Sequence, residues 1–132
     1  TPVPVPGLFE ALSALGVGRV LGLVTNDSEA PARAHLEAHA ITHHFDFISG
    51  YDSGFGSKPE PGQLLEFCAA TGMRAGATAM VGDSRHDLQA GRAAGMTTIG
   101  VLTGLAEAEA LTDLADVVLP DIGHIAGWLS AS

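Results

Sequence analysis

Five residues in this chain have groups suited to chemistry on a phosphoryl group: Thr25, Asn26, Lys58, Asp83 and Asp87. Thr25 and Asn26 can donate hydrogen bonds to phosphoryl oxygens, and the Lys58 ammonium can neutralise the negative charge that builds up in phosphoryl transfer. Asp83 and Asp87 can hold a hard divalent ion, because Mg²⁺ needs only one or two protein carboxylates and completes its shell with water and phosphate oxygen. Together these residue types predict phosphoryl chemistry with Mg²⁺ as the cofactor.

Each residue also has a plain structural interpretation, in which Thr25 caps a helix and Lys58 is a solvated loop lysine. The positions of the residues favour the functional interpretation. Thr25, Lys58 and Asp83 follow three successive predicted strands, and ligands of an open parallel sheet bind outside the carboxyl ends of its strands. Surface accidents would not fall at three successive strand ends, so we expect the five residues to converge at one edge of a sheet.

Strands and helices alternate along the chain. Short continuous apolar runs predict strands buried on both faces, at residues 20–24, 45–49, 77–81, 97–101 and 117–119. Helical spacing, with proline at helix starts and glycine at helix ends, predicts helices at residues 6–15, 29–40, 61–72, 85–94 and 106–111, and a last helix with Ile122, Ile125, Trp128 and Leu129. This order predicts an α/β fold, a Rossmann-like parallel sheet with helices on both faces.

Composition narrows the classes of partner. The chain has 132 residues, one domain's worth, and a formal net charge of −9. Without a cluster of Lys or Arg, nothing would release counterions from a nucleic acid, so we expect no nucleic-acid partner. No apolar stretch approaches the roughly 18 residues of a membrane span, and the lone Cys68 fits a reducing compartment. We therefore expect a soluble, cytoplasmic protein with no membrane partner.

Three segments resemble the haloacid dehalogenase-like hydrolases, in the order in which that family carries its second, third and fourth motifs. They are Val24-Thr25-Asn26, then Ser57-Lys58-Pro59-Glu60-Pro61, then Val81-Gly82-Asp83-Ser84-Arg85-His86-Asp87 with the residues up to Met96. The resemblance covers nearly the whole chain, and its closest match is the phosphoglycolate-phosphatase-like branch.

The resemblance implies a role for each residue. Thr25 would bind the transferred phosphoryl group, Asn26 would support that loop, and Lys58 would bridge the phosphoryl group and the nucleophile. Asp83 would be a Mg²⁺ ligand, and Asp87 would orient the metal site from the following helix. The implied activity is a Mg²⁺-dependent phosphatase of a small phosphorylated metabolite, acting through an aspartyl-phosphate, with Thr25 and Lys58 as its catalytic residues here.

One family motif is missing. These enzymes open with Asp-x-Asp at the end of a first strand, followed by a helical cap, and no Asp-x-Asp occurs in this chain. In the family that strand lies between the strands that here end at Thr25 and Gly82. We therefore expect residues 1–132 to be the carboxyl-terminal part of the core domain, inactive alone. The absent strand would leave a slot about 9.6 Å wide, completed by an upstream segment or by another chain.

Three alternatives stay open at this stage. The chain could be a non-catalytic module that binds phosphate or a partner. A receiver domain also uses Asp, Thr, Lys and Mg²⁺, but the order of the motifs disagrees with it. The histidines at positions 35, 39, 43 and 44 could form a metal site, although a solvated helix face is the better interpretation.

Overall fold

The computed structural model describes residues 8–102 and 108–131, which form five short strands and six helices. The strands are β1 (Gly22–Val24), β2 (Phe47–Ser49), β3 (Ala79–Gly82), β4 (Thr97–Val101) and β5 (Val117–Leu119). The helices are α1 (Leu8–Gly16), α2 (Glu29–Ala38), α3 (Gly62–Thr71), α4 (Arg85–Ala94), α5 (Ala108–Leu111) and α6 (Ile125–Ala131). Single 3₁₀ turns occupy residues 42–44, 51–53, 75–77 and 122–124.

Every predicted strand and helix is present, with shifts of one or two residues at most ends. The predicted starts of the first helix at residue 6 and of the fifth at residue 106 lie outside the described residues. None of the helices in the described ranges is long and apolar enough to cross a membrane.

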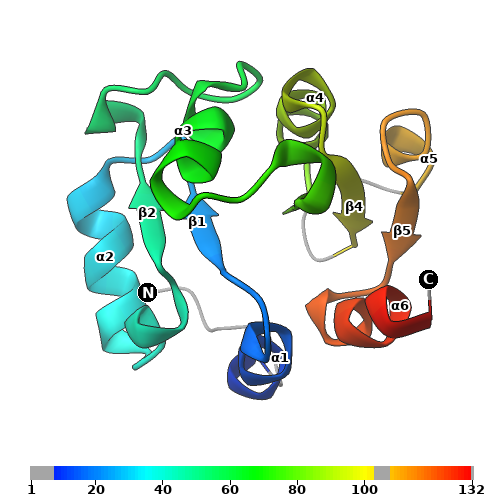
Figure 1. The fold of residues 1–132 in the computed structure, drawn as a ribbon, viewed down its shortest axis with the longest axis horizontal. Coiled ribbons are helices and arrows are strands. Elements are labelled where there is room, and N and C mark those ends of the chain that lie inside the picture. The colour runs from blue at the N-terminus through cyan, green and yellow to red at the C-terminus, as the bar shows by residue number, and fades with distance from the viewer. Residues whose placement is uncertain (1–7, 103–107, 132) are drawn as a thin grey trace.

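The strands form two parallel sheets rather than one. β1 pairs with β2, and β3, β4 and β5 pair in that order. Figure 1 shows β1 and β2 beside α2 and α3, and β4 and β5 in the other part of the molecule with α4, α5 and α6. Within the described residues no ladder joins β1 to β3, as expected if those two strands cannot pair directly.

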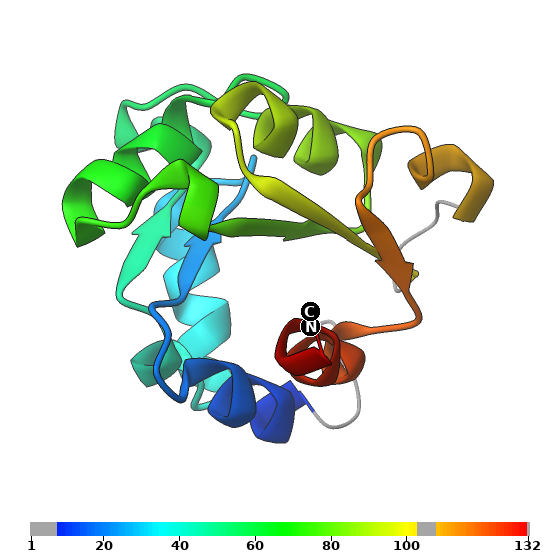
Figure 2. The ribbon, with the colours of Figure 1, turned by 45° about the vertical axis from the view of Figure 1, so that its right-hand side comes forward.

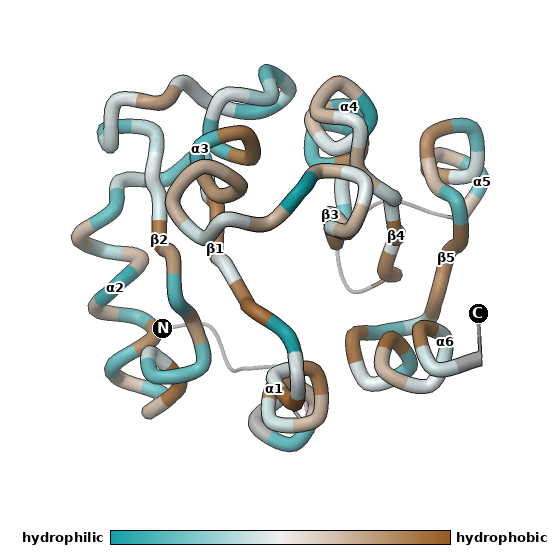
Figure 3. The backbone as a smooth tube through the Cα atoms, viewed as in Figure 1, coloured by the Kyte–Doolittle hydropathy of each residue, from teal (hydrophilic) through white to brown (hydrophobic). Residues whose placement is uncertain are grey.

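Helices cover both faces of the sheets. On one face, Leu64 of α3 and Ala90 of α4 pack with Met80 of β3. On the other, Leu15 of α1 and Ile125 of α6 pack with the β4 residues, and these two helices lie together in Figure 2. Because both faces are covered, the strands carry apolar residues with little polar alternation, visible as the hydrophobic colour of β5 in Figure 3.

Candidate functional site

Lys58 and Asp87 form the ion pair that links the two sheets at their carboxyl ends. The Lys58 Nζ lies 2.5 Å from Asp87 Oδ1, and the side chains are 10% and 12% exposed. The same Nζ donates a hydrogen bond to the backbone oxygen of Val24 at 3.2 Å. An ammonium has three N–H donors. Two are used by contacts among the described residues, and the third can serve an anion.

Asn26 fixes the backbone of the Lys58 loop. Its Oδ1 accepts a hydrogen bond from Lys58 N at 2.9 Å, and its Nδ2 donates to Lys58 O at 3.0 Å. The side-chain amide thus holds a residue 32 positions later in the chain. Asn26, which follows β1, therefore holds the backbone of Lys58 in place. The sequence did not reveal this contact.

The Thr25 loop is held by hydrogen bonds on several sides. Thr25 N donates to Ser49 O at 3.0 Å, and Thr25 Oγ1 accepts from Asp27 N at 3.0 Å. Because Oγ1 only accepts in that contact, its hydroxyl hydrogen stays available to an anion.

Gln63 also supports this loop, and the sequence analysis missed it. Its Nε2 donates to Thr25 O at 3.0 Å and to Ser49 Oγ at 3.2 Å, and both Gln63 and Ser49 are fully buried. The signal that could have revealed it is a glutamine at a core position beside Leu64 at the start of α3.

The turn from β3 into α4 positions the two aspartates. Ser84 caps α4 by accepting a hydrogen bond from Asp87 N at 3.4 Å, and Asp87 Oδ2 accepts one from Asp83 N at 3.2 Å. A Cβ at position 82 would overlap the Cβ of Asp87. Gly82 is therefore required for Asp87 to reach back to Lys58.

The Asp83 carboxylate is the best candidate for a metal ligand. Asp83 is half-buried, and its carboxylate has no hydrogen-bond partner among the described residues, while Asp87 is already bound to Lys58. No group of three or more His, Cys, Asp or Glu side chains in residues 8–102 and 108–131 could hold a metal ion. A set of two carboxylates fits Mg²⁺, which takes the rest of its ligands from water and phosphate.

A second set of hydrogen bonds ties the start of α2 to the turn at residues 51–53. Asp52 Oδ1 accepts from Glu29 N at 2.8 Å, and Glu29 accepts from Ser53 Oγ at 2.6 Å and from Arg33 Nε at 2.7 Å. The hydrogen bond from Ser53, and then that from Arg33, lowers the pKa of Glu29. These contacts hold the chain that follows Asn26.

The structure brings all five predicted residues to the carboxyl ends of β1 and β3, with Lys58, Asp83 and Asp87 at one cavity. It leaves the histidines elsewhere. His86 is exposed. The ring centroids of His35 in α2 and His39, the residue that caps the end of α2, are 4.6 Å apart. Burial, and next the charge of His43, lowers the pKa of His44.

Comparison with known proteins shows the family. A model of the family described as haloacid dehalogenase-like hydrolase matches residues 1–101. The chain is 38% identical over 117 residues to a protein named probable phosphatase IndB of Dickeya dadantii, covering 88% of this chain and 51% of that protein. It is 37% identical over 99 residues to a phosphoglycolate phosphatase of Mesorhizobium japonicum, covering 74% of this chain and 44% of that protein. The chain thus spans about half the length of these curated relatives.

The fold is also similar to that of a solved haloacid dehalogenase-like protein. A haloacid dehalogenase-like protein from Agrobacterium tumefaciens superimposes with a TM-score of 0.84 and 26% identity, covering 96% of this chain and 60% of that one. Three observations point to the same family. They are the two parallel sheets flanked by helices, the three motifs at the strand ends, and these similarities. The chain belongs to the haloacid dehalogenase-like hydrolases.

Proposed function

We propose that the whole protein is a Mg²⁺-dependent phosphatase of a small phosphorylated metabolite. The observation that carries this proposal is the pairing of the Lys58 ammonium with the Asp87 carboxylate, with Asp83 at the same cavity and its backbone N–H donating to Asp87. The names of the relatives, a phosphatase and a phosphoglycolate phosphatase, favour a phosphoric monoester as the substrate.

The charges in the site support a need for a cation. Asp87 pairs with Lys58, so the formal charge of the three side chains is negative and lies on Asp83. A phosphoryl dianion would be repelled by that carboxylate at short range. Asp83, with Asp87 behind it, would hold Mg²⁺, which would supply the positive charge that stabilises the phosphoryl oxygens.

The residues of this chain would then divide the work. The third N–H of Lys58 and the hydroxyl hydrogen of Thr25 bind and orient phosphoryl oxygens, and Asn26 keeps the Lys58 loop in place. Asp87 positions the ammonium so that its charge faces the developing anion. The nucleophile would be an aspartate outside these 132 residues. Its carboxylate would attack phosphorus as the ester P–O bond breaks and the metabolite leaves as an alcohol, and water would then hydrolyse the aspartyl-phosphate to release inorganic phosphate.

The test uses the whole protein with p-nitrophenyl phosphate as substrate. Hydrolysis should require Mg²⁺, and Asp83→Asn should remove it, because the amide keeps the shape but loses the charge. Asp46→Asn is the matched control, since Asp46 is exposed and precedes β2, at the amino end of the sheet. Turnover that persists in EDTA or in Asp83→Asn would refute the metal role. Absence of hydrolysis under all conditions, with phosphate still bound, would favour the non-catalytic module.

A further inference from the structure

Gln63 is a buried amide with one group unsatisfied. Its Nε2 donates to Thr25 O at 3.0 Å and to Ser49 Oγ at 3.2 Å, while its Oε1 is buried without a partner among the described residues. A buried acceptor that has no donor costs free energy and offsets much of what the two hydrogen bonds supply. Net stability is therefore a poor explanation for an amide at this position of the core, and its donors direct attention to what they hold.

The hydrogen bond from Gln63 fixes one peptide plane of the Thr25 loop. Thr25 O belongs to the trans peptide that joins Thr25 to Asn26, in which the C=O and the N–H point in opposite directions. Because Gln63 holds the C=O, the Asn26 N–H points away from Gln63. The orientation of Thr25, whose Oγ1 accepts from Asp27 N, depends on the same peptide.

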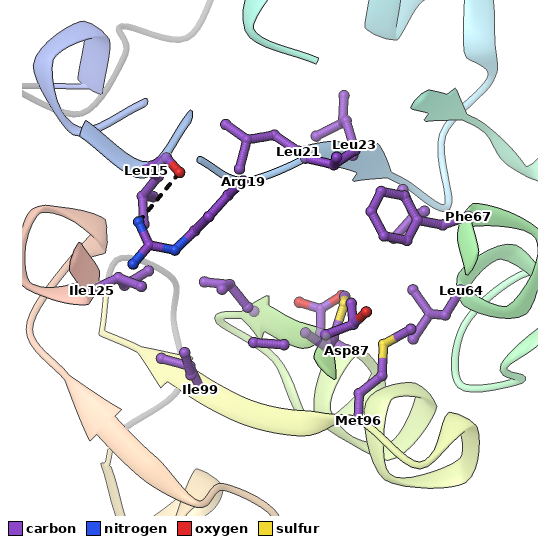
Figure 4. A pocket seen from close by; sticks show the side chains of 18 of the residues that line it. Leu15, Arg19, Leu21, Leu23, Leu64, Phe67, Asp87, Met96, Ile99 and Ile125 are labelled. Atoms are coloured by element: carbon purple, nitrogen blue, oxygen red, sulfur yellow. Dashed lines mark hydrogen bonds between the residues drawn. The ribbon is translucent and has the colours of Figure 1, made fainter. Parts of the chain in front are cut away.

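Helix α3 gives Gln63 a firm base. Leu64 and Phe67 of this helix are 3% and 7% exposed, and Figure 4 shows both beside the cavity that Asp87 also lines. The helix begins soon after Lys58 in the chain. The segment that carries Lys58 therefore leads directly into the packed helix that carries Gln63.

Two side-chain amides thus bind the two loops in opposite directions. Asn26, from the Thr25 loop, holds both backbone groups of Lys58. Gln63, from the segment after Lys58, holds the backbone of Thr25. These contacts, which we call the amide brace, close a ring of hydrogen bonds and chain. The ring sets the separation between the Lys58 ammonium and the Thr25 hydroxyl.

We propose that Gln63 is a positioning residue for phosphate binding, and that it acts with Asn26 as one unit. The loss of either amide would open the ring and free both loops, so Gln63 controls phosphate affinity without touching the phosphoryl group. The inference rests on the proposed function, because it takes Thr25 and Lys58 as the groups that bind phosphoryl oxygens.

The first test measures the dissociation constant of inorganic phosphate for the whole protein with Mg²⁺, by calorimetry. Gln63→Met keeps the length of the side chain but removes both donors, and should raise that constant about tenfold, as expected for one weakened hydrogen bond to a charged group. The KM for p-nitrophenyl phosphate should rise by a similar factor. The kcat should fall less, because Lys58 Nζ keeps its contacts with Asp87 and Val24.

Ile41→Val is the control matched for stability. Ile41 is 4% exposed and packs with Leu12 and Leu36, and an isoleucine-to-valine change in a core has a modest cost comparable to that of losing two hydrogen bonds. It precedes β2, at the amino end of the strand, whereas the Thr25 loop is at the carboxyl end of the parallel strand β1. Ile41→Val should leave phosphate affinity and KM unchanged. If both variants weaken phosphate binding equally, Gln63 has only a structural role and the proposal is wrong.

A double-mutant cycle tests whether the two amides act as one unit. Asn26→Ala and Gln63→Met should each weaken phosphate binding about tenfold, and the double variant should be little weaker than either, because the ring is already open. A loss of about a hundredfold in the double variant would show that the two residues act independently, and would overturn the amide brace.

Amide hydrogen exchange gives a readout that needs neither phosphate nor turnover. Lys58 N donates to Asn26 Oδ1 at 2.9 Å, while the hydrogen bonds of Gln63 go to Thr25 and Ser49. Gln63→Met should nevertheless speed the exchange of the Lys58 amide.

Ile41→Val should leave that exchange unchanged. Equal exchange of the Lys58 amide in Gln63→Met and in the unchanged protein would refute the proposal. Should Gln63→Met not fold, Asn26→Ala gives the reciprocal test, because opening the ring should speed exchange of the Thr25 amide. If the unchanged protein binds no phosphate, the proposed function fails and the role of Gln63 in phosphate binding fails with it. If it binds phosphate without hydrolysis, only the proposed function fails.

Discussion

The two halves of this molecule differ in the balance of residues that they bury. In the β3–β5 half, with α4, α5 and α6, most of the large, fully buried side chains are apolar, such as Leu88, Ile99 and Leu111, and one, Thr98, is polar. In the β1–β2 half the side chains buried to the same degree are polar, Gln63 and Ser49. The first half is therefore stabilised mainly by apolar burial, and the second uses buried hydrogen bonds to shape the Thr25 loop.

This difference matches what each half contributes to the site. The apolar half supplies Asp83 and Asp87 from a rigid strand–helix turn. The polar half supplies Thr25 and Lys58 from loops that are held by side-chain amides. The halves meet at the Lys58–Asp87 ion pair, so the geometry of the site depends on how the two halves are held relative to each other.

Replacing one buried residue in each half should show the difference between the halves as a difference in the free energy of unfolding. Leu88→Ala should lower the free energy of unfolding by about 3 kcal/mol, because it opens a cavity in a fully packed core. Gln63→Met should cost about 1 kcal/mol, because it removes two hydrogen bonds but also an oxygen, Oε1, that has no partner. Urea denaturation measures both values. Equal costs would contradict the distinction between the halves.

Gly82→Ala should act at the boundary between the halves. The new Cβ would overlap Asp87, so we expect a loss of about 2 kcal/mol in unfolding free energy and displacement of the Asp87 carboxylate from Lys58. Gly76→Ala is the matched control, since a Cβ added at that position would have no heavy atom within 4 Å. Urea denaturation of the two variants checks this. If Gly82→Ala is as stable as Gly76→Ala, the turn from β3 into α4 can rearrange to accommodate the added Cβ, which would contradict this prediction.

The smallest effect should be a pH dependence in the polar half. The Ser53 and Arg33 hydrogen bonds lower the pKa of Glu29 in the folded state. The stability from this carboxylate is therefore present above the ordinary glutamate pKa and is lost as the pH falls through the lower folded-state value. Urea denaturation at a series of pH values between 6 and 3 should show that the unfolding free energy falls less steeply with pH in Glu29→Gln than in the unchanged chain. Identical slopes would mean that these hydrogen bonds do not contribute.

Much of the fold and the choice of site residues follow from the sequence. Apolar runs bounded by turn residues located all five strands, and the strand ends located Thr25, Lys58 and Asp83. The strand edges could not be located as closely, because a strand begins where it finds a partner. Leu21 belongs to a predicted strand, yet the ladder with β2 starts at Gly22, and Leu21 contributes only its backbone oxygen, which accepts from Asp46 N.

The contacts that hold the loops could not be predicted in this way. Asn26 binds Lys58 across 32 positions, and Asp52 accepts from Glu29 across 23. Arg85 pairs with Asp113 across 28 positions, which raises the pKa of the arginine and lowers that of the aspartate. Such pairs depend on how loops approach each other in space, and no local spacing encodes them.

Amide hydrogen exchange tests most directly whether the slot expected between β1 and β3 is completed by a strand from the rest of the protein. Thr25 N donates to Ser49 O of β2 and Thr78 O accepts from Thr97 N of β4, so by strand alternation the amides of Gly22, Val24, Ala79 and Val81 face the slot. In the 132-residue chain these four amides should exchange faster than that of Thr25, the internal reference, and in the whole protein they should become as slow as Thr25. Four amides that exchange equally fast in both proteins, with Thr25 protected in each, would contradict the account.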